Sequence, residues 1–377
     1  MIDYSQIPSP SFVLDEEKLE KNLAIIKKVR QAADIEIIVA FKGFAMWSVF
    51  PTVRKYVQGA TASSLHEAKL CHEHMKSKSH TYAVAYQEDE FDEICSLSSH
   101  LTFNSLSQFE RFRDRVPQEV SVGLRVNPEW SDVDVDLYNP SNPTSRLGMT
   151  VENMPEALPD RVEGLHFHVL CESSAASLVH VLENFEQKFG PYLDRIKWVN
   201  MGGGHLMTSE GYDLELLIDT IKAFKARHNT DIILEPGSAF AWQAGDLVCS
   251  ILDIVENRGV KTAIADISFT CHMPDCLEMP YKPNIRGAKK DVIQGEDYAY
   301  RIGGVSCLAG DFMEAYGFPH PLQVGDKLVF EDMMHYTMVK TTLFNGVKHP
   351  SIGIVDSSGK FRLVRAFGYE DYRDRLS

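Results

Sequence analysis

The sequence predicts a (β/α)8 barrel of the TIM type followed by an all-β domain. Between residues 35 and 235, eight short apolar runs alternate with amphipathic segments, as expected for parallel strands joined by crossover helices. After about Gly245 the helical pattern stops, and short strand-like runs separated by turn residues follow. We therefore expect a barrel domain over residues 14–244. Residues 245–377, together with residues 1–13, are expected to form a β domain.

The expected elements follow one another along the chain. The first is a helix over residues 15–32, with leucine, isoleucine and valine at helical spacing and acids in the first turn. The eight apolar runs are residues 35–41, 59–63, 82–86, 101–104, 120–126, 164–170, 196–201 and 231–235. Further helices are expected over residues 64–76, 87–97, 105–116, 173–193 and 212–228. Residues 127–159 are rich in proline and asparagine and predict a long loop, which is often functional in barrels.

The second half of the chain contains shorter runs. Strands are expected within residues 247–259, 262–269, 298–304, 326–333, 351–356 and 360–367. Because no long helical pattern separates these runs, they predict an all-β domain.

Composition limits the classes of function. The net charge is −15, which disfavours nucleic acid as a partner and is compatible with a cationic substrate. No run of eighteen apolar residues occurs, and the first ten residues have no signal-peptide pattern, so we expect neither a membrane span nor secretion. The seven cysteines are scattered without a CxxC pair. Reduced cysteines in a cytoplasmic enzyme are the default for such a pattern, and no metal site is predicted.

A lysine ends the first expected strand. In a barrel the carboxyl ends of the strands carry the active site, and Lys42 directly follows the apolar run at residues 35–41. A lysine that reaches into a closed site can form a Schiff base with an aldehyde. Alternatively, Lys42 only extends to solvent at the rim of the barrel.

Two further features lie at the same end. The sequence "MGGGH", residues 201–205, follows the seventh strand, and its glycines allow backbone N–H groups to approach an anion such as phosphate. Glu235 begins "EPG" after the eighth strand and is a candidate partner for a protonated ring nitrogen. A reactive lysine, a phosphate site and a carboxylate together favour pyridoxal 5'-phosphate as the cofactor. Taken singly, the glycines also fit a flexible turn, and Glu235 also fits a salt bridge.

The pair His166 and His168 has a competing interpretation. Side chains two residues apart on a strand point to one face, so both histidines could ligate a metal in a barrel hydrolase, with His205 as a third candidate. No matching aspartate is evident. In the other interpretation, one histidine stacks on a flat cofactor and the other is a core residue.

Several motifs, in order, carry a family resemblance. The strings "VAFKGFA", "LRVNP", "GLHFHV", "NMGGG" and "EPG" resemble the alanine-racemase-like, or fold-type III, pyridoxal-phosphate decarboxylases. The strings "DISFTCHMPDCLEMPYKP", "GGVSCLAGDFMEAY" and "FEDMMHYTMVKTTLFNG" are similar to the carboxynorspermidine (carboxyspermidine) decarboxylase branch, and the resemblance spans nearly the whole chain. It implies decarboxylation of a carboxylated polyamine. The alternatives are a diamino-acid decarboxylase and an amino-acid racemase; racemases of this type place an arginine rather than a carboxylate near the ring nitrogen.

The resemblance also implies roles for individual residues. Lys42 would be the Schiff-base lysine, and Cys307 would reach the neighbouring subunit's site and protonate the substrate carbon. The cofactor would be held by His168, Gly203, Gly204, Glu235, Gly237 and Tyr336. The substrate would be held by Ser238, Asp266, Asp275 and Asp311, with Glu278 a further acid in the same pocket. A homodimer with shared active sites is expected, with the β domain contributing to the site and to the dimer interface.

Two departures separate the chain from ornithine decarboxylases. Ser238 stands where those enzymes have an arginine that assists the phosphate, and "CLAGD" places Asp311 four residues after Cys307 rather than directly after it. Both departures weaken ornithine or lysine as the substrate.

Overall fold

The computed structural model describes residues 2–133 and 139–377. The chain forms two compact units. The barrel unit is Glu20–Phe240, and the sheet unit is Met1–Leu19 together with Ala241–Ser377. Within the described residues, no helix combines the length and the apolar character that crossing a membrane would require.

The barrel unit contains a parallel sheet that closes on itself. The strand order is β2-β10-β9-β8-β7-β6-β5-β4-β3, and all neighbours are parallel. Since β2 and β3 are two parts of one segment, broken at Ile38, the sheet has eight positions, and the predicted (β/α)8 barrel is confirmed. The strands are β2 (Glu36–Ile37), β3 (Val39–Ala40), β4 (Ala60–Ala62), β5 (Ser79–Tyr82), β6 (Ser98–Phe103), β7 (Ser121–Arg125), β8 (Val162–His166), β9 (Trp198–Asn200) and β10 (Asp231–Leu234).

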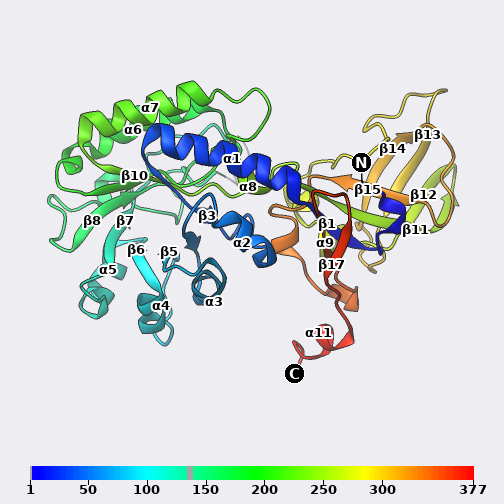
Figure 1. Ribbon diagram of the computed structural model, residues 1–377, viewed down its shortest axis with the longest axis horizontal. Helices are drawn as coiled ribbons and strands as arrows, with labels where there is room; N and C mark the ends of the chain where they lie inside the picture. The colour runs from blue at the N-terminus through cyan, green and yellow to red at the C-terminus, as the bar shows by residue number, and fades with distance from the viewer. Residues whose placement is uncertain (1, 134–138) are drawn as a thin grey trace. The chain divides into compact units, whose positions relative to one another are not determined.

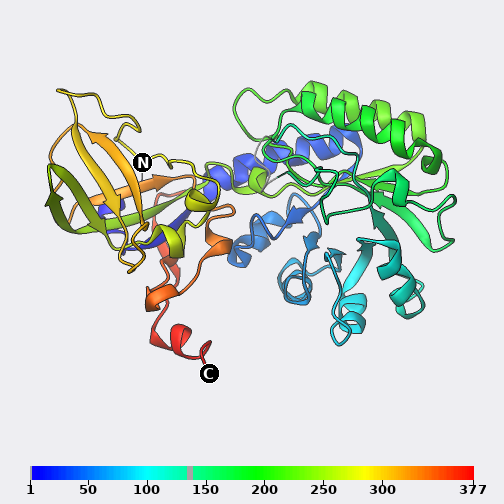
Figure 2. The same cartoon turned by 180° about the vertical axis from the view of Figure 1, so that it is seen from behind.

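Helices alternate with these strands along the chain and lie outside them in both views (Figures 1 and 2). They are α1 (Glu16–Ala33), α2 (Phe50–Val53), α3 (Leu65–Leu70), α4 (Phe91–Leu97), α5 (Leu106–Phe112), α6 (Ala175–Leu193), α7 (Leu214–His228) and α8 (Ser238–Ala241). Serine side chains cap α3, α5 and α6 by accepting a hydrogen bond from a backbone N–H of the first turn. The described part of the long loop 127–159 contains only the short helical turn η6 (Val151–Asn153) and an isolated bridge from Val126 to Met149.

One end of the barrel is filled by Trp198, the first residue of β9. A Cβ atom on Gly123 or Gly164 would lie 2.3 Å or 2.1 Å from the indole, so glycines on the two strands before β9 make room for it. The indole also packs edge-on against His100 of β6. Because β6 is three strands away, this contact crosses the barrel interior. Trp198 therefore closes the amino-terminal end and leaves the carboxyl end for a site.

The prediction of the third strand was wrong: the strand, β5, is Ser79–Tyr82 and not residues 82–86. Its side chains are polar yet mostly buried, and they bond to one another: Ser79 to Thr81, and Thr81 to Ser98 of β6. Hydrogen bonds between buried polar groups offset their loss of water. The strand therefore lacks the apolar pattern that sequence reasoning sought. The sixth strand, β8, ends at His166, so His168 lies in the loop after it.

The sheet unit is a mixed eight-stranded sheet. Its order is β14-β13-β12-β11-β1-β16-β17, with β15 also paired to β11. The long strand β11 joins two halves, because its first part pairs with β1 and β15 and its second part with β12. The strands are β1 (Ser11–Asp15), β11 (Gly245–Asn257), β12 (Val260–Ala265), β13 (Tyr298–Gly303), β14 (Phe312–Phe318), β15 (Lys327–Glu331), β16 (Ser351–Val355) and β17 (Phe361–Arg365). The helices are α9 (Phe269–His272), α10 (Asp275–Glu278) and α11 (Tyr369–Arg373).

Sequence reasoning missed two strands of this sheet, β1 and β14. Strand β1 directly precedes α1 and lies far from the strand-like runs after residue 245, so no local pattern linked it to them. It pairs with β11 and β16, which lie more than two hundred residues later in the chain. The chain therefore starts in the sheet unit, passes through the barrel unit and returns.

Candidate active site

Lys42 lies at the carboxyl end of β3, as the sequence predicts, and contacts a histidine. Its Nζ is 2.8 Å from Nε2 of His168. Solvent reaches the amine, but the surrounding protein desolvates it, and this desolvation, together with the nearby charge of Arg125, lowers the pKa of Lys42 to about 8. An amine with this pKa is partly uncharged near neutral pH and can act as a nucleophile.

The glycine run after β9 comes close to the backbone around it. A Cβ atom on Gly203 would lie 2.4 Å from the carbonyl oxygen of Glu235, and one on Gly204 would lie 2.2 Å from the backbone of Leu170. Gly202 and Gly204 also have positive φ angles of 66° and 90°, which side chains disfavour. Residues with side chains therefore do not fit here.

Glu235 follows β10 and is buried against two polar side chains. Asn200 Nδ2 donates to Glu235 Oε1 over 2.6 Å, and the Thr61 hydroxyl also bonds the carboxylate. Burial raises the pKa of Glu235, while these hydrogen bonds and the charges of Lys42 and Arg125 oppose the increase. Because burial and the neighbouring groups shift its pKa in opposite directions, this carboxyl group can either hold or release a proton.

Asn200 was missed by sequence reasoning, although it is the last residue of β9. Its Oδ1 accepts the Gly202 N–H over 2.8 Å while its Nδ2 bonds Glu235. The glycine run and the carboxylate are thus held by one side chain. Its position at a strand end was the available signal.

Arg125 was also missed, although it ends β7 and is almost fully buried. Its guanidinium lies over the ring of Tyr82, 4.5 Å from the centroid, and its Nη2 donates to the His168 carbonyl over 3.2 Å. Its charge is one cause of the lowered pKa of Lys42, His166 and His168. The rule that selected Lys42, a charged residue at the end of an apolar strand, would have selected Arg125 as well.

Gly237 directly precedes α8, and Ser238 is the first residue of that helix. Ser238 is buried, and its hydroxyl donates to Glu172 over 3.0 Å. Glu172 belongs to the loop after β8, which also carries His168 and Cys171. The predicted barrel-unit residues Lys42, His168, Gly203, Gly204, Glu235, Gly237 and Ser238 therefore all lie at the carboxyl end of the strands.

The metal interpretation of His166 and His168 finds no complete ligand set. Burial keeps the pKa of both histidines well below its usual value, so both are neutral. His166 Nε2 is 3.7 Å from the Glu235 carboxylate. Across the described residues, no group of three or more His, Cys, Asp or Glu side chains is arranged to hold a metal ion.

In the sheet unit, Asp311 ties two segments together. Its Oδ1 accepts the N–H groups of Phe269 and Thr270 at the start of α9, over 2.6 and 3.2 Å. Its Oδ2 accepts the Ser306 N–H over 3.1 Å and the Ser306 hydroxyl over 2.6 Å. The neighbouring Cys307 is exposed, and its N–H donates to Asn345. These contacts favour a role for Asp311 in shaping the loop that carries Cys307.

The other predicted acids of the sheet unit are also engaged. Lys340 forms ion pairs with both Asp275 and Glu278 of α10. Asp266 Oδ1 accepts the Ser250 N–H over 2.8 Å. Tyr336, in the segment before Lys340, has a φ angle of 49°, which is unusual for an aromatic residue.

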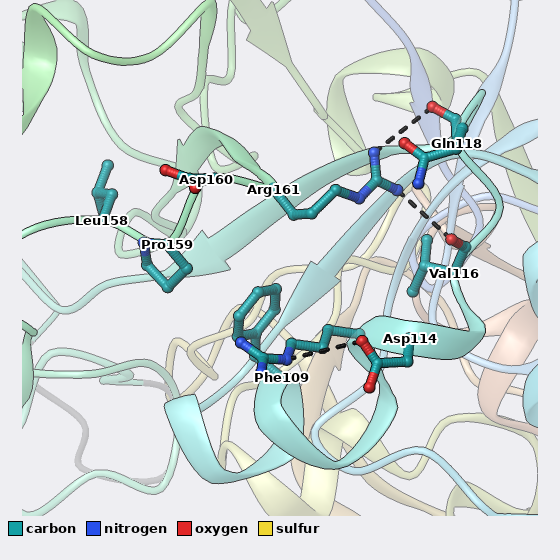
Figure 3. A pocket seen from close by; sticks show the side chains of 9 residues that line it. Phe109, Asp114, Val116, Gln118, Leu158, Pro159, Asp160 and Arg161 are labelled. Atoms are coloured by element: carbon teal, nitrogen blue, oxygen red, sulfur yellow. Dashed lines mark hydrogen bonds and ion pairs between the residues drawn. The ribbon is translucent and has the colours of Figure 1, made fainter.

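A cavity of about 510 Å³ lies elsewhere in the barrel unit (Figure 3). Its lining includes Phe109 of α5, Arg113, Asp114 and Arg161; Arg161 donates to the Pro117 carbonyl over 2.9 Å. The lining residues at 116–118 and 158–161 precede β7 and β8, so this cavity faces the amino-terminal end of those strands. None of the predicted site residues lines it.

The fold and the site define a class of protein. A closed parallel barrel presents a lysine, a glycine run without room for side chains and a buried carboxylate at one end, and a separate sheet unit carries an exposed cysteine. These are the features of a barrel enzyme that binds pyridoxal phosphate.

Comparison with known proteins gives the family. The family model described as pyridoxal-dependent decarboxylase, C-terminal sheet domain, matches residues 11–334. A carboxyaminopropylagmatine decarboxylase from Synechocystis sp. is 52% identical over 374 residues, which are 99% of this chain and 96% of the relative. A carboxynorspermidine/carboxyspermidine decarboxylase from Campylobacter jejuni is 42% identical over 98% of both chains. The chain therefore belongs to the pyridoxal-dependent decarboxylases.

A solved structure agrees with this assignment. The crystal structure of carboxynorspermidine decarboxylase from Campylobacter jejuni, complexed with norspermidine, superposes with a TM-score of 0.91 at 41% identity. The match covers 98% of this chain and all of that chain. A diaminopimelate decarboxylase at 18% identity shares the fold, with a TM-score of 0.82.

The predicted cofactor is confirmed by the family, and this chain is a pyridoxal-phosphate-dependent decarboxylase. The residues fit the cofactor on structural grounds. Both ring nitrogens of His166 and Nε of Arg125 are buried without a hydrogen-bond partner in the described residues, beside Lys42 and Glu235. The glycine run after β9 carries no side chains, and its backbone packs directly against that of Glu235 and Leu170 at the same end of the barrel.

Proposed function

We propose that this chain decarboxylates carboxynorspermidine and carboxyspermidine to norspermidine and spermidine. The observation that carries the proposal is the similarity, over nearly its whole length, to a carboxynorspermidine decarboxylase solved with norspermidine. The net charge of −15 supports a polycationic substrate, because an acidic protein field attracts cations.

A second candidate substrate is carboxyaminopropylagmatine. The observation that favours it is the 52% identity to a decarboxylase of that name, compared with 42% and 37% for two relatives named after carboxynorspermidine and carboxyspermidine. The substrates differ at the far end, where agmatine ends in a planar guanidinium and the other two end in an ammonium. A guanidinium can bond a carboxylate through two parallel N–H groups, so the arrangement of acids around that end decides between them.

The barrel residues would prepare the reaction. When bound, pyridoxal phosphate accepts the electron pair that remains after loss of carbon dioxide. We assign Lys42 to covalent binding of the cofactor aldehyde, and Gly203 and Gly204 to the phosphate, together with Gly237. His168 would lie against the flat ring. Glu235 would pair as a carboxylate with the protonated ring nitrogen, and the hydrogen bonds and positive charges around it favour that ionised form.

The sheet-unit residues would complete the site. Following the family resemblance, we assign Cys307 to protonation of the substrate α-carbon in a neighbouring subunit, and Tyr336 to the phosphate. Asp266 and Asp275 would face the distal amine, and Ser238 and Asp311 would be further substrate contacts, with Asp311 also fixing the Cys307 loop. This assignment requires a homodimer with shared sites, in which residues 14–244 bind the cofactor and residues 245–377 contribute to the site and the interface. The expected location of the protein is the cytoplasm.

The test is carbon dioxide release from a panel of substrates. The purified chain with pyridoxal phosphate is assayed with carboxynorspermidine, carboxyspermidine and carboxyaminopropylagmatine, and with L-ornithine and meso-diaminopimelate as controls. We expect kcat/KM for at least one of the first three to exceed both controls by more than about 100-fold. Equal turnover of ornithine or diaminopimelate would overturn the proposed substrate class, and a preference for the agmatine derivative would select the second candidate.

A further inference from the structure

Gly203, His168 and Lys42 form a continuous chain of hydrogen-bonding atoms. The backbone N–H of Gly203 donates to Nδ1 of His168 over 2.8 Å. On the other side of the same ring, Nε2 is 2.8 Å from Nζ of Lys42. Both distances are typical of hydrogen bonds.

The first bond fixes where the imidazole carries its hydrogen. Nδ1 accepts the Gly203 N–H, so it has no hydrogen of its own, and a neutral imidazole must then carry its single N–H at Nε2. Burial keeps the pKa of His168 well below its usual value, and the charge of Arg125 acts in the same direction. The ring is therefore neutral and presents an N–H, not a lone pair, to Lys42.

The second bond then has only one possible direction. A lysine ammonium has three donors and no acceptor, so it cannot bond an Nε2–H group. An uncharged amine has a lone pair and can accept that hydrogen. The contact between His168 and Lys42 is thus a hydrogen bond only when Lys42 is uncharged.

His168 is held firmly enough for this selection to operate. A Cβ atom on Gly203 would be 3.3 Å from Cε1 of the ring and 2.4 Å from the Glu235 carbonyl, so the glycine backbone lies directly against the imidazole. At the same time Arg125 Nη2 donates to the His168 carbonyl. These contacts oppose a rotation of the ring that would present an unprotonated nitrogen to Lys42.

We propose that His168 is a positioning residue for cofactor loading, which through Gly203 holds the free Lys42 amine in its uncharged, nucleophilic form. The proposal rests on the assignment of Lys42 as the cofactor lysine. In the loading step the nitrogen lone pair of Lys42 attacks the aldehyde carbon of pyridoxal phosphate. Carbon and nitrogen become doubly bonded, and the aldehyde oxygen leaves as water with both amine hydrogens. An ammonium has no lone pair for this attack.

Other charged groups around Lys42 act in both directions. Burial and Arg125 favour the uncharged amine, whereas Glu235, Cys171 and Glu67 favour the ammonium. The hydrogen bond from His168 also favours the uncharged amine. Its removal should therefore shift Lys42 toward the ammonium.

The experiment first establishes the lysine and then its protonation. The full-length chain is loaded with pyridoxal phosphate, reduced with borohydride and mapped by peptide mass spectrometry; modification elsewhere than Lys42 would contradict the proposed site and not the hydrogen-bond argument. The chain is then stripped of cofactor, shown to regain its absorbance on reloading, and labelled with limiting acetic anhydride across pH 6–10. The extent of Lys42 labelling gives its titration midpoint, and stopped-flow absorbance gives the rate of loading.

Three variants separate hydrogen-bond donation from stacking. His168→Phe keeps a flat ring but has no donor, His168→Gln keeps an N–H donor without the ring, and His205→Phe changes another buried histidine of the barrel unit as a control. We expect a wild-type midpoint near 8. In His168→Phe we expect a midpoint about one pH unit higher and loading up to about tenfold slower at pH 7. In His168→Gln and His205→Phe we expect titration midpoints close to that of wild type. An unchanged midpoint in His168→Phe, or an equal increase in His168→Gln, would overturn the proposal.

Discussion

At the scale of single residues, the candidate site depends on side chains that serve two neighbours each. Asn200 bonds both the Glu235 carboxylate and the Gly202 N–H, and His168 bonds both Gly203 and Lys42. Each hydrogen bond fixes the direction of the next one. A change at one such residue is therefore expected to act on chemistry as well as on stability.

Glu235→Gln tests the carboxylate at this scale. Gln can still accept the Asn200 hydrogen bond, so the site should keep its shape, but an amide cannot hold the proton at the cofactor nitrogen. We expect kcat to fall by about 100-fold or more, with a changed cofactor absorbance. The matched control is Glu163→Gln on β8, whose carboxylate instead pairs with Lys197 and bonds Ser121; it should behave as wild type. A Glu235→Gln enzyme with wild-type kcat would remove Glu235 from the mechanism.

At the scale of elements, polar side chains connect strands and loops that are distant in the sequence. Asp311 links its own loop to the start of α9, and Ser79, Thr81 and Ser98 connect β5 to β6. A buried carboxylate contributes most to the free energy of unfolding when it accepts hydrogen bonds from several backbone N–H groups. These connections hold in place loops that lack regular structure.

Asp311→Ala should loosen the Cys307 loop. Removal of the carboxylate leaves the N–H groups of Phe269, Thr270 and Ser306 without their acceptor, at a cost of roughly 1–3 kcal/mol in the free energy of unfolding. We expect a lower midpoint of urea denaturation and faster alkylation of Cys307, followed by peptide mass spectrometry. Asp114→Ala, at a side chain that is 94% exposed, is the control. Equal midpoints and equal alkylation rates in the two variants would contradict the role assigned to Asp311.

The barrel strands also carry a pH-sensitive pair. The rings of His80 on β5 and His100 on β6 are 3.9 Å apart, and burial lowers the pKa of His100 to about 4 and that of His80 well below its usual value. An unfolded histidine binds a proton below about pH 6.5, so between pH 6.5 and 4 the unfolded chain binds more protons than the folded one. Stability must therefore decrease as pH falls through this window, by roughly 1–3 kcal/mol for His100.

Denaturation at pH 7, 5.5 and 4.5 measures this effect. His100→Gln removes one titrating group and should make stability less dependent on pH than in wild type. His66→Gln, at an exposed histidine of α3, should leave the dependence unchanged. The prediction fails if His100→Gln and wild type lose stability in parallel.

At the scale of the whole molecule, the chain divides its candidate residues between two units. Lys42 and Glu235 belong to the barrel unit, and Cys307 belongs to the sheet unit. If Cys307 acts in a second copy of the chain, as the family resemblance implies, then every complete site needs residues from two copies.

Mixing two inactive variants tests the shared site. Lys42→Ala and Cys307→Ala are each expected to lose most activity. When equal amounts are dissociated and reassociated, half of the dimers should be mixed, and each mixed dimer would contain one site with both residues intact. Activity should then recover to about one quarter of wild type. Size-exclusion chromatography confirms the dimers, and no recovery in demonstrably mixed dimers would place both residues in the same copy.

The sequence by itself determined the features that depend on local pattern and on position along a strand. The alternation of apolar runs and helices predicted the barrel, and the strand ends predicted Lys42, the glycine run and Glu235, because a parallel barrel brings all carboxyl ends to one side. Only the tertiary structure decided which of these groups bond one another. The partners of Asn200, Arg125 and Asp311 lie on other elements of the chain, and β5 escaped detection because its buried hydroxyls are satisfied by a neighbouring strand. Such contacts are set by packing between distant segments, which no local pattern of residues records.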